Sequence, residues 1–209
     1  MKNNPYPGKF IVIEGLDGSG QSTQAGLLKD FLIKKSYQVI LTKEPTSDSE
    51  AGKRIRETLD KKFETEPSKL QELFAQDRKK HLENVIIPAL KEGKIVISDR
   101  YFFSSFAYGA SSGVNLDWLI KINNEFLLPD LTFILKVKPE VCLERIEKRN
   151  LKRTFFEEKE KLEKVWQNYQ VLPARFENVY MIEGEKPKEA VFSQIKEIAL
   201  SQIISKLSK

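Results

Sequence analysis

The sequence predicts an α/β fold in which one parallel sheet is covered by helices on both faces. Five short runs rich in apolar and β-branched residues recur along the 209-residue chain, separated by longer stretches, several of which have a helical period. Most of the runs are continuous rather than alternating, as is typical of strands buried on both faces. Strands that alternate with helices in this way favour parallel pairing within one sheet.

The expected elements can be placed along the chain. The five expected strands are Phe10–Glu14, Gln38–Thr42, Lys94–Ser98, Leu131–Val137 and Asn178–Ile182. Side chains recurring every three or four positions predict helices over Ser22–Lys35, Leu70–Leu90 and Val191–Leu207. No repeat, linker or low-complexity tract divides the chain, so a single domain over residues 1–209 is expected. The polar stretch 145–164 is expected to form a flap over a site, with a lid at about 145–160.

Composition excludes several classes of protein. Hydrophobic residues make up 40% of the chain, yet no apolar run approaches the roughly 20 residues that cross a bilayer, so no membrane partner is expected. The N-terminal residues lack an apolar signal core, and the single cysteine, Cys142, excludes an intrachain disulfide, which fits a cytoplasmic protein. The net charge of +5 attracts anions. Such an anion could be a nucleic acid or a small phosphorylated substrate. Because lysine and arginine are interleaved with glutamate, a solvated helix face is favoured over a nucleic-acid patch, and no nucleic-acid partner is expected.

The strongest motif is a glycine-rich turn between the first expected strand and the first expected helix. The segment Ile13-Glu-Gly-Leu-Asp-Gly-Ser-Gly-Gln-Ser-Thr23 has the context of a phosphate-binding P-loop. Glycines let backbone N–H groups surround a phosphate, and the helix N-terminus adds free donors and a positive dipole end. The alternative is a glycine turn without a ligand. The residues expected to bind ATP are Gly15, Leu16, Asp17, Gly18, Ser19, Gly20, Gln21, Ser22 and Thr23, and Ser22 is also expected to bind Mg²⁺.

One position departs from the P-loop consensus G-x-x-x-x-G-K-[ST], because Gln21 stands where lysine is expected. A glutamine amide can donate a hydrogen bond to a phosphate oxygen but carries no charge. The loss of one charged donor, such as the lysine, at a transferring phosphoryl group typically raises the barrier by about 2.7–4 kcal/mol. Either a neighbouring cation replaces the lysine, or the chain is slow or inactive.

A second motif, Ser98-Asp-Arg-Tyr101, lies where an apolar strand ends. Ligands of parallel sheets bind beyond the carboxyl ends of the strands. We therefore expect Asp99 to orient Mg²⁺ or its water, and Arg100 to hold a phosphate in a bidentate fork. A surface ion pair at a strand end is the alternative.

Three weaker motifs, each taken alone, can also be explained without a function: as a solvated loop, as a core phenylalanine with a surface arginine, or as a solvated helix face. A Lys43-Glu44-Pro45 turn leaves the second strand. Phe74 and Arg78 are four residues apart, so a ring that can stack on a base and a guanidinium share one helix face. The basic run from Arg145 to Arg153 could close over ATP phosphates as a lid. The only histidine, His81, is interpreted as a helix residue without a special role, so no histidine triad or His/Cys metal cluster is expected elsewhere.

These motifs, in this order, resemble the thymidylate kinase family over nearly the whole chain. The resemblance includes the glycine turn, Thr42-Lys-Glu-Pro45, Leu73-Phe-Ala-Gln-Asp-Arg78, Ser98-Asp-Arg-Tyr101 and Leu127-Leu-Pro-Asp-Leu131. It implies a three-layer P-loop kinase fold with a helical lid, transfer of the ATP γ-phosphoryl group to dTMP with Mg²⁺, and a homodimer. No dedicated general base is needed, because the attacking phosphate oxygen is already anionic.

The resemblance also implies roles for individual residues. Phe74 would stack on thymine, Arg78 would bond its O4 edge, and Ser105 and Tyr108 would flank the deoxyribose. Arg56 and Arg100 would hold the dTMP phosphate, Asp17 would meet the 3′-hydroxyl, and Glu44 would belong to the same substrate site. The residues implied in catalysis are Asp17, Gln21, Arg100, Arg149 and Arg153, the last two acting from the lid.

Two departures besides Gln21 separate the chain from the family pattern. Gly109 follows Tyr108 where many relatives have glutamine, and Lys43 stands where arginine is common. Three other functions stay open: a deoxynucleoside kinase, which shares a P-loop and an Asp-Arg strand end; a nucleotide-binding protein with weak or no catalysis, which only Gln21 supports; and a nucleic-acid binder, which only the basic balance supports. An acceptor screen, calorimetric binding and salt-dependent DNA binding distinguish them.

Overall fold

The computed structural model describes residues 1–148 and 155–204, with side chains described at 1–148 and 159–202. Its five strands form one sheet in the order β2-β3-β1-β4-β5, and every neighbouring pair is parallel. The strands are β1 Lys9–Gly15, β2 Val39–Lys43, β3 Ile95–Asp99, β4 Leu131–Lys136 and β5 Val179–Glu183. All five predicted strands and the predicted parallel sheet are confirmed.

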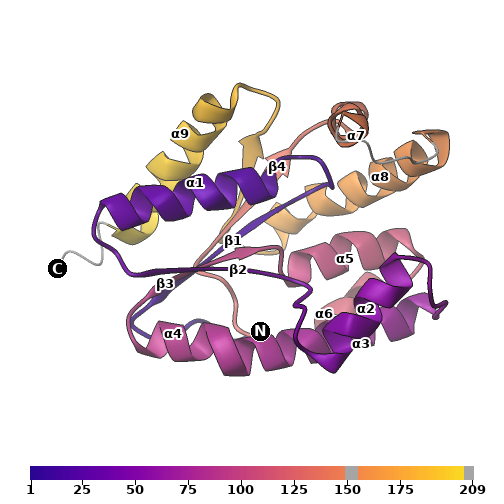
Figure 1. Cartoon of the computed structure of the whole chain (residues 1–209), viewed down its shortest axis with the longest axis horizontal. Coiled ribbons are helices and arrows are strands. Elements are labelled where there is room, and N and C mark those ends of the chain that lie inside the picture. The colour runs from indigo at the N-terminus through magenta and orange to yellow at the C-terminus, as the bar shows by residue number, and fades with distance from the viewer. Residues whose placement is uncertain (149–154, 205–209) are drawn as a thin grey trace.

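Helices cover both faces of this sheet and produce three layers. The helices are α1 Gln21–Lys34, α2 Glu50–Leu59, α3 Pro67–His81, α4 Ile87–Lys91, α5 Phe102–Ser111, α6 Leu116–Ile122, α7 Pro139–Glu147, α8 Phe155–Gln170 and α9 Lys188–Ala199. Shorter segments are η1 Leu82–Ile86, η2 Leu172–Ala174 and η3 Leu200–Ile204. Figure 1 shows α1 and α9 on one face, with α4 and α5 on the other. The last residues of the predicted helix 191–207 lie outside the described residues.

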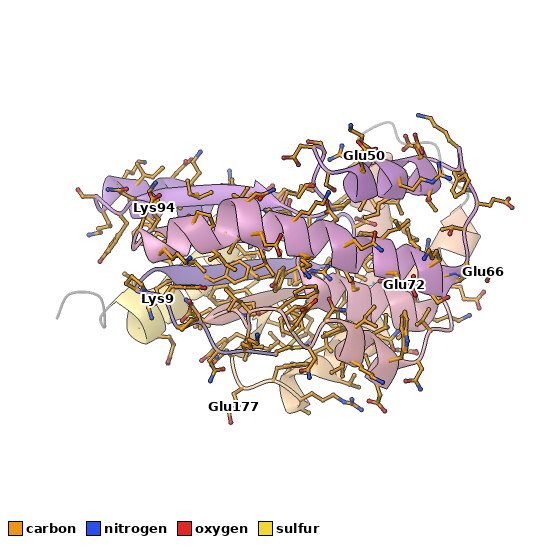
Figure 2. The ribbon with its side chains drawn as sticks, turned by 90° about the horizontal axis from the view of Figure 1, so that it is seen from below. Lys9, Glu50, Glu66, Glu72, Lys94 and Glu177 are labelled. Atoms are coloured by element: carbon orange, nitrogen blue, oxygen red, sulfur yellow. The ribbon has the colours of Figure 1, made fainter. Side chains whose placement is uncertain are left out.

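The central strands are buried on both faces, which explains their continuous apolar sequences. Phe10, Ile11, Val12 and Ile13 of β1 have no exposed surface, and every residue of β3 is buried. The edge strands β2 and β5 are more exposed. Glu50, Glu66 and Glu177, labelled in Figure 2, lie at the outer surface. No helix within the described ranges is long and apolar enough to cross a bilayer.

The predicted helix 70–90 is part of one rod in which the winding changes. The α3 helix passes through the π-helical segment η1 into α4. Pro88 is the second residue of α4, has no N–H to donate, and in an α-helix its ring would meet the carbonyl of the residue four positions earlier. The wider π turn, Leu82–Ile86, ends two positions before this proline. Periodicity predicted the helix, but the change of winding was not predicted.

The strand order brings the two strongest sequence motifs together. The chain runs from β1 to the edge strand β2, returns to β3 between them, and then crosses to β4 on the other side of β1. Asp99 at the end of β3 is therefore in register with Ile13 of β1 and with Lys43 of β2. The carboxyl ends of β1 and β3 form the crevice in which open α/β sheets bind ligands.

Candidate active site

The glycine turn after β1 adopts a conformation that only glycine accommodates. Gly15, Gly18 and Gly20 have φ angles of 152°, 85° and 100°. A Cβ atom at Gly18 would come within 2.5 Å of the Cys142 carbonyl oxygen, and one at Gly15 within 2.6 Å of the Ser19 hydroxyl. Gly20 is the N-cap of α1, so the free N–H groups of the helix begin directly after it. This is the geometry of a phosphate-binding loop.

A carboxylate and a hydroxyl lie together beside this loop. The Ser22 hydroxyl donates to Asp99 Oδ2 at 2.5 Å, and Lys43 Nζ donates to the same oxygen at 3.0 Å. Asp99 is 4% exposed, and its Oδ1 accepts no hydrogen bond within the described residues. Mg²⁺ prefers a carboxylate or two together with phosphate oxygens and waters, so this pair fits the expected cation. No cluster of three or more His, Cys, Asp or Glu side chains suited to a metal occurs in the described ranges.

Gln21 is turned toward a cation. Because a guanidinium only donates, the amide oxygen of Gln21 must face Arg100, where it accepts hydrogen bonds from Nε at 3.0 Å and from Nη2. The amide nitrogen then donates to the Leu16 carbonyl at 2.8 Å and to the Ser19 hydroxyl at 2.5 Å. The neighbouring positive charge expected from the sequence therefore has a candidate in Arg100.

Arg100 links the P-loop to α5. Its backbone has a φ of 75°, and its side chain donates to the Gly15 carbonyl at 3.0 Å, the Ser104 hydroxyl at 2.8 Å and Asp17 Oδ1 at 2.8 Å. Burial lowers the pKa of Arg100, but the nearby Tyr108 and Asp17 groups raise it above its ordinary value, so the guanidinium stays charged. The strained backbone, together with the four groups to which the Arg100 side chain donates, holds a permanent positive charge at the end of β3.

A buried glutamate supports this arrangement from below. Glu14 has no exposed surface and accepts hydrogen bonds from the Tyr101 and Ser104 backbone N–H groups and from the Ser104 and Tyr169 hydroxyls. Burial raises the pKa of Glu14, although Arg100 and these donors act in the opposite direction. Glu14 thereby ties β1 to α5 and α8 beneath the P-loop.

A cavity of about 190 Å³ opens beside the P-loop, between α3, α5 and the ends of β1 and β3. Seven of the eight predicted substrate-binding residues line it: Asp17, Glu44, Phe74, Arg78, Arg100, Ser105 and Tyr108. The Tyr108 hydroxyl accepts from the Asp17 N–H at 3.1 Å, and Arg100 lies over its ring at 5.4 Å. The eighth, Arg56, is on exposed α2 and donates to the Pro45 carbonyl at 3.5 Å. We refer to this space as the acceptor cavity.

The inner end of the acceptor cavity is a buried charge network. Arg78 is 1% exposed and donates to Glu44 Oε2 at 2.8 Å, Asn123 Oδ1 at 2.6 Å and the Ser105 hydroxyl at 3.2 Å. The ring of His81 lies 3.1 Å from Glu44 Oε1 through Nδ1. A solvated turn at Glu44 is therefore excluded, because this carboxylate is 3% exposed. The interpretation of His81 as a residue without a special role was incomplete, since it holds the partner of Arg78.

Comparison with known proteins agrees with this geometry. A sequence model of the thymidylate kinase family matches residues 13–195. A probable thymidylate kinase of Pyrococcus horikoshii is 40% identical over 202 residues, which cover 94% of this chain and 98% of the relative. A probable thymidylate kinase of Thermococcus onnurineus is 40% identical over 205 residues, covering 94% and 100%. A thymidylate kinase of Caldicellulosiruptor saccharolyticus is 37% identical over 197 residues, covering 91% and 95%.

The chain belongs to the thymidylate kinase family. The predicted family and the predicted phosphotransferase class are confirmed. The match begins within β1 and ends within α9, so it includes the end of β1, the other four strands and the site described above.

Three residues predicted to act in catalysis or ATP binding are not seen at the cavity in the described part of the structure. Arg149 and Arg153, together with the middle of the predicted lid, lie outside the described residues. Thr23 is exposed in the first turn of α1. Arg145 of α7 donates to the Ser19 carbonyl at 3.2 Å and to the Gly184 carbonyl at 3.4 Å, so the first arginine of the basic run contacts the P-loop.

Sequence reasoning missed several residues of this candidate site, including four with polar or charged side chains. Gln71, Ser104 and Lys161 line the acceptor cavity, and Glu14 supports it. Glu14 carried a signal, because a charged residue ends an otherwise apolar strand. Gln71 lies one turn before Phe74 on the same helix face. Lys161 carried none, since it is one of three lysines interspersed with glutamates in α8.

Proposed function

We propose that this chain transfers the γ-phosphoryl group of ATP to dTMP and releases dTDP and ADP. The observation that carries the proposal is the arrangement of the P-loop, the Ser22–Asp99 pair and the acceptor cavity around the end of β3. A phosphate donor held by the P-loop and an acceptor in the cavity share Asp17 and Arg100 at their boundary. A phosphoryl group can pass between two ligands that meet at such a boundary.

The donor side is assigned to the P-loop. We propose that the backbone N–H groups from Gly15 to Thr23 hold the ATP phosphates, with the N-terminus of α1 adding its partial positive charge. Ser22 and Asp99 hold Mg²⁺, either directly or through its waters, and the cation neutralises charge on the phosphates when bound. The carboxylate oxygen of Asp99 that lacks a partner supports this assignment.

The acceptor side is assigned to the cavity. Phe74 stacks on the thymine ring, Arg78 donates to its 4-carbonyl, and Ser105 and Tyr108 flank the sugar. Arg56 and Arg100 hold the acceptor phosphate, and Arg100 exchanges one of its present partners, such as Asp17, for the phosphate, because its five N–H groups already donate to protein atoms. Of the five N–H groups of Arg78, three donate to partners within the described residues, which leaves two to donate to a ligand. Glu44 keeps this guanidinium in place.

The chemistry is an in-line displacement. An anionic phosphate oxygen of dTMP forms a bond to the γ-phosphorus as the bond to the β–γ bridging oxygen breaks, and ADP leaves with that electron pair. Arg100 holds the attacking phosphate and places a positive charge beside Gln21, where the P-loop lysine is lacking. We propose that Arg149 and Arg153 add charge from the lid. Positioning and electrostatics carry the catalysis, so no general base is assigned.

Two further assignments rest on the family resemblance. We propose that the chain acts as a homodimer in the cytoplasm. Light scattering of the purified protein tests the first assignment, because the monomer has a mass of 24.2 kDa and a dimer scatters with twice that mass.

The test of the proposed function is a coupled ADP-release assay with ATP, Mg²⁺ and a panel of dTMP, dUMP, thymidine and dCMP. We expect the highest kcat/KM with dTMP, since arginines at the phosphate end favour monophosphates over thymidine. Preference for thymidine would identify a deoxynucleoside kinase. Tight calorimetric binding of ATP and dTMP without dTDP formation would identify a binding protein instead.

A further inference from the structure

A buried glutamine in the acceptor cavity has an oxygen without a partner. Gln71, Phe74 and Arg78 are spaced three and four residues apart on α3, so they share one helix face, and all three line the cavity. Gln71 is 4% exposed, and its Oε1 accepts no hydrogen bond within the part of the chain that the structure describes. A buried carbonyl oxygen is normally paired, and an unpaired one at a binding site indicates a ligand donor.

A glycine on the facing helix leaves room for this amide. A Cβ atom at Gly109 of α5 would lie 3.1 Å from Cδ of Gln71 and 3.0 Å from a methyl group of Leu119. Both distances are tighter than ordinary contacts, so a side chain at position 109 would compete with Gln71 for the same space. The absence of a side chain at 109 therefore lets α3, rather than α5, supply an amide to the cavity.

The atoms of this face complement one edge of a pyrimidine. Arg78 can only donate, which suits the 4-carbonyl of thymine. The neighbouring N3–H of thymine is a donor and requires an acceptor beside that arginine. Gln71 Oε1 is such an acceptor on the same helix face. We propose that Gln71 reads the acceptor base by accepting the N3–H of thymine, an inference that rests on the proposed function.

The same pair rejects cytosine. Cytosine has an unprotonated N3 and a 4-amino group, so Gln71 Oε1 would face an acceptor and Arg78 would face a donor. Turning the amide to present Nε2 corrects only the first mismatch, because Arg78 has no acceptor. Unpaired polar groups in a buried site give strong discrimination. Gln71 therefore contributes binding energy by accepting the protonated N3, while Arg78 supplies the rejection of the 4-amino group.

The variant that tests this is Gln71→Met, which keeps the length of the side chain and removes its hydrogen bonding. We expect the KM for dTMP to rise about 3–10-fold with the KM for ATP unchanged, as for the loss of one neutral hydrogen bond. The melting temperature of the unliganded variant should equal or exceed that of the natural chain, because a buried unpaired oxygen has been removed. Gln76→Met, at an exposed glutamine of the same helix, is the matched control and should change neither quantity.

A second ligand isolates the contact. The N3-methyl analogue of dTMP keeps both carbonyls and lacks the N3–H, so the natural chain should bind it at least about 3–10-fold more weakly than dTMP in calorimetry. Gln71→Met should show a smaller difference between the two ligands, because only the steric effect of the methyl group is left.

Two results would overturn the proposal. One is unchanged discrimination between the two ligands in Gln71→Met; the other is a fall in its melting temperature with a joint rise of both KM values, which marks a structural role. Turnover of dTMP by the natural chain is measured separately, so a failure of the proposed function is distinguishable from a failure of this contact.

Discussion

At the scale of single residues, the site depends on how buried polar atoms are paired. Gln21, Arg100 and Asp17 form a continuous chain of contacts, with the charge of Arg100 shared between a P-loop amide and a P-loop carboxylate. Arg78 is held by Glu44, which is itself held by His81. Charges removed from water are stable only when they are paired in this way. Each pairing therefore limits which substitutions the site accepts.

Substitution of Gln21 by lysine tests how the site manages without the P-loop lysine. Lysine at position 21 would bring an ammonium group next to the Arg100 guanidinium, which now donates to the Gln21 oxygen. Repulsion between the two cations should move Arg100 away from the acceptor phosphate. We expect kcat to stay within about threefold of the natural chain, far below the gain that a missing charged donor would give, while the KM for dTMP rises. Steady-state kinetics with both substrates measures this.

The control is Gln21→Met, which removes the hydrogen bonds without adding charge. It should lower kcat/KM for dTMP less than the lysine variant does. A gain in kcat of a hundredfold or more for Gln21→Lys, the scale of one charged donor, would show that Arg100 does not substitute for the lysine.

At the scale of elements, the P-loop is defined by its backbone. Gly18 and Gly20 both have positive φ angles, yet their surroundings differ. A Cβ atom at Gly18 would collide with the Cys142 carbonyl oxygen of α7 at 2.5 Å, whereas one at Gly20 would meet no atom within 4 Å. Substitutions at these two positions therefore allow the cost of backbone strain to be measured apart from the cost of overpacking within one loop.

Alanine at these two glycines should therefore destabilise the protein by different amounts. Gly20→Ala carries only the cost of a side chain in the left-handed region, about 1–2 kcal/mol of unfolding free energy. Gly18→Ala carries that cost and, in addition, the overpacking against α7, about 1–3 kcal/mol more. Urea denaturation without nucleotide measures both. Equal losses for the two variants would contradict the close packing of the P-loop against α7.

At the scale of the whole molecule, the strand order determines where the two substrates meet. The order β2-β3-β1-β4-β5 places the end of β3 between Lys43 and the P-loop. The proposed donor side then lies at the N-terminus of α1 and the proposed acceptor side between α3 and α5. Mg²⁺ is assigned only to the donor side, through Ser22 and Asp99. The two binding events should therefore differ in their dependence on the metal.

Thermal unfolding in the presence of each ligand tests this division. A saturating concentration of dTMP, about 100 times its Kd, should stabilise the protein by about 2.7 kcal/mol. For a chain of this size, this stabilisation corresponds to a rise in the melting temperature of about 5–11 °C. Addition of EDTA should abolish turnover but leave the rise in melting temperature that dTMP causes. If EDTA removed the dTMP shift as well, the assignment of the metal to the donor side alone would be wrong.

The sequence by itself determined the five strands, three of the helices and the glycine turn, whereas α5 and α8 were not predicted. A continuous apolar run indicates a strand buried on both faces, and glycines in a turn indicate positive φ angles. Both features depend mainly on the properties of each residue itself, so a local pattern can predict them. The Phe74 and Arg78 pair was predictable for the same reason, because helical spacing fixes which side chains share a face.

Only the tertiary structure decided the partners. Gln71 and Gly109 are 38 positions apart, and the packing of α3 against α5 alone shows that one fills the space left by the other. Arg100 meets Gln21 because β1 and β3 are neighbours in the sheet. Lys161 in its Lys/Glu-rich helix and the buried pairing of His81 with Glu44 likewise carried no distinguishing local signal. Contacts between distant segments depend on the whole packing arrangement, which no local pattern of residues specifies.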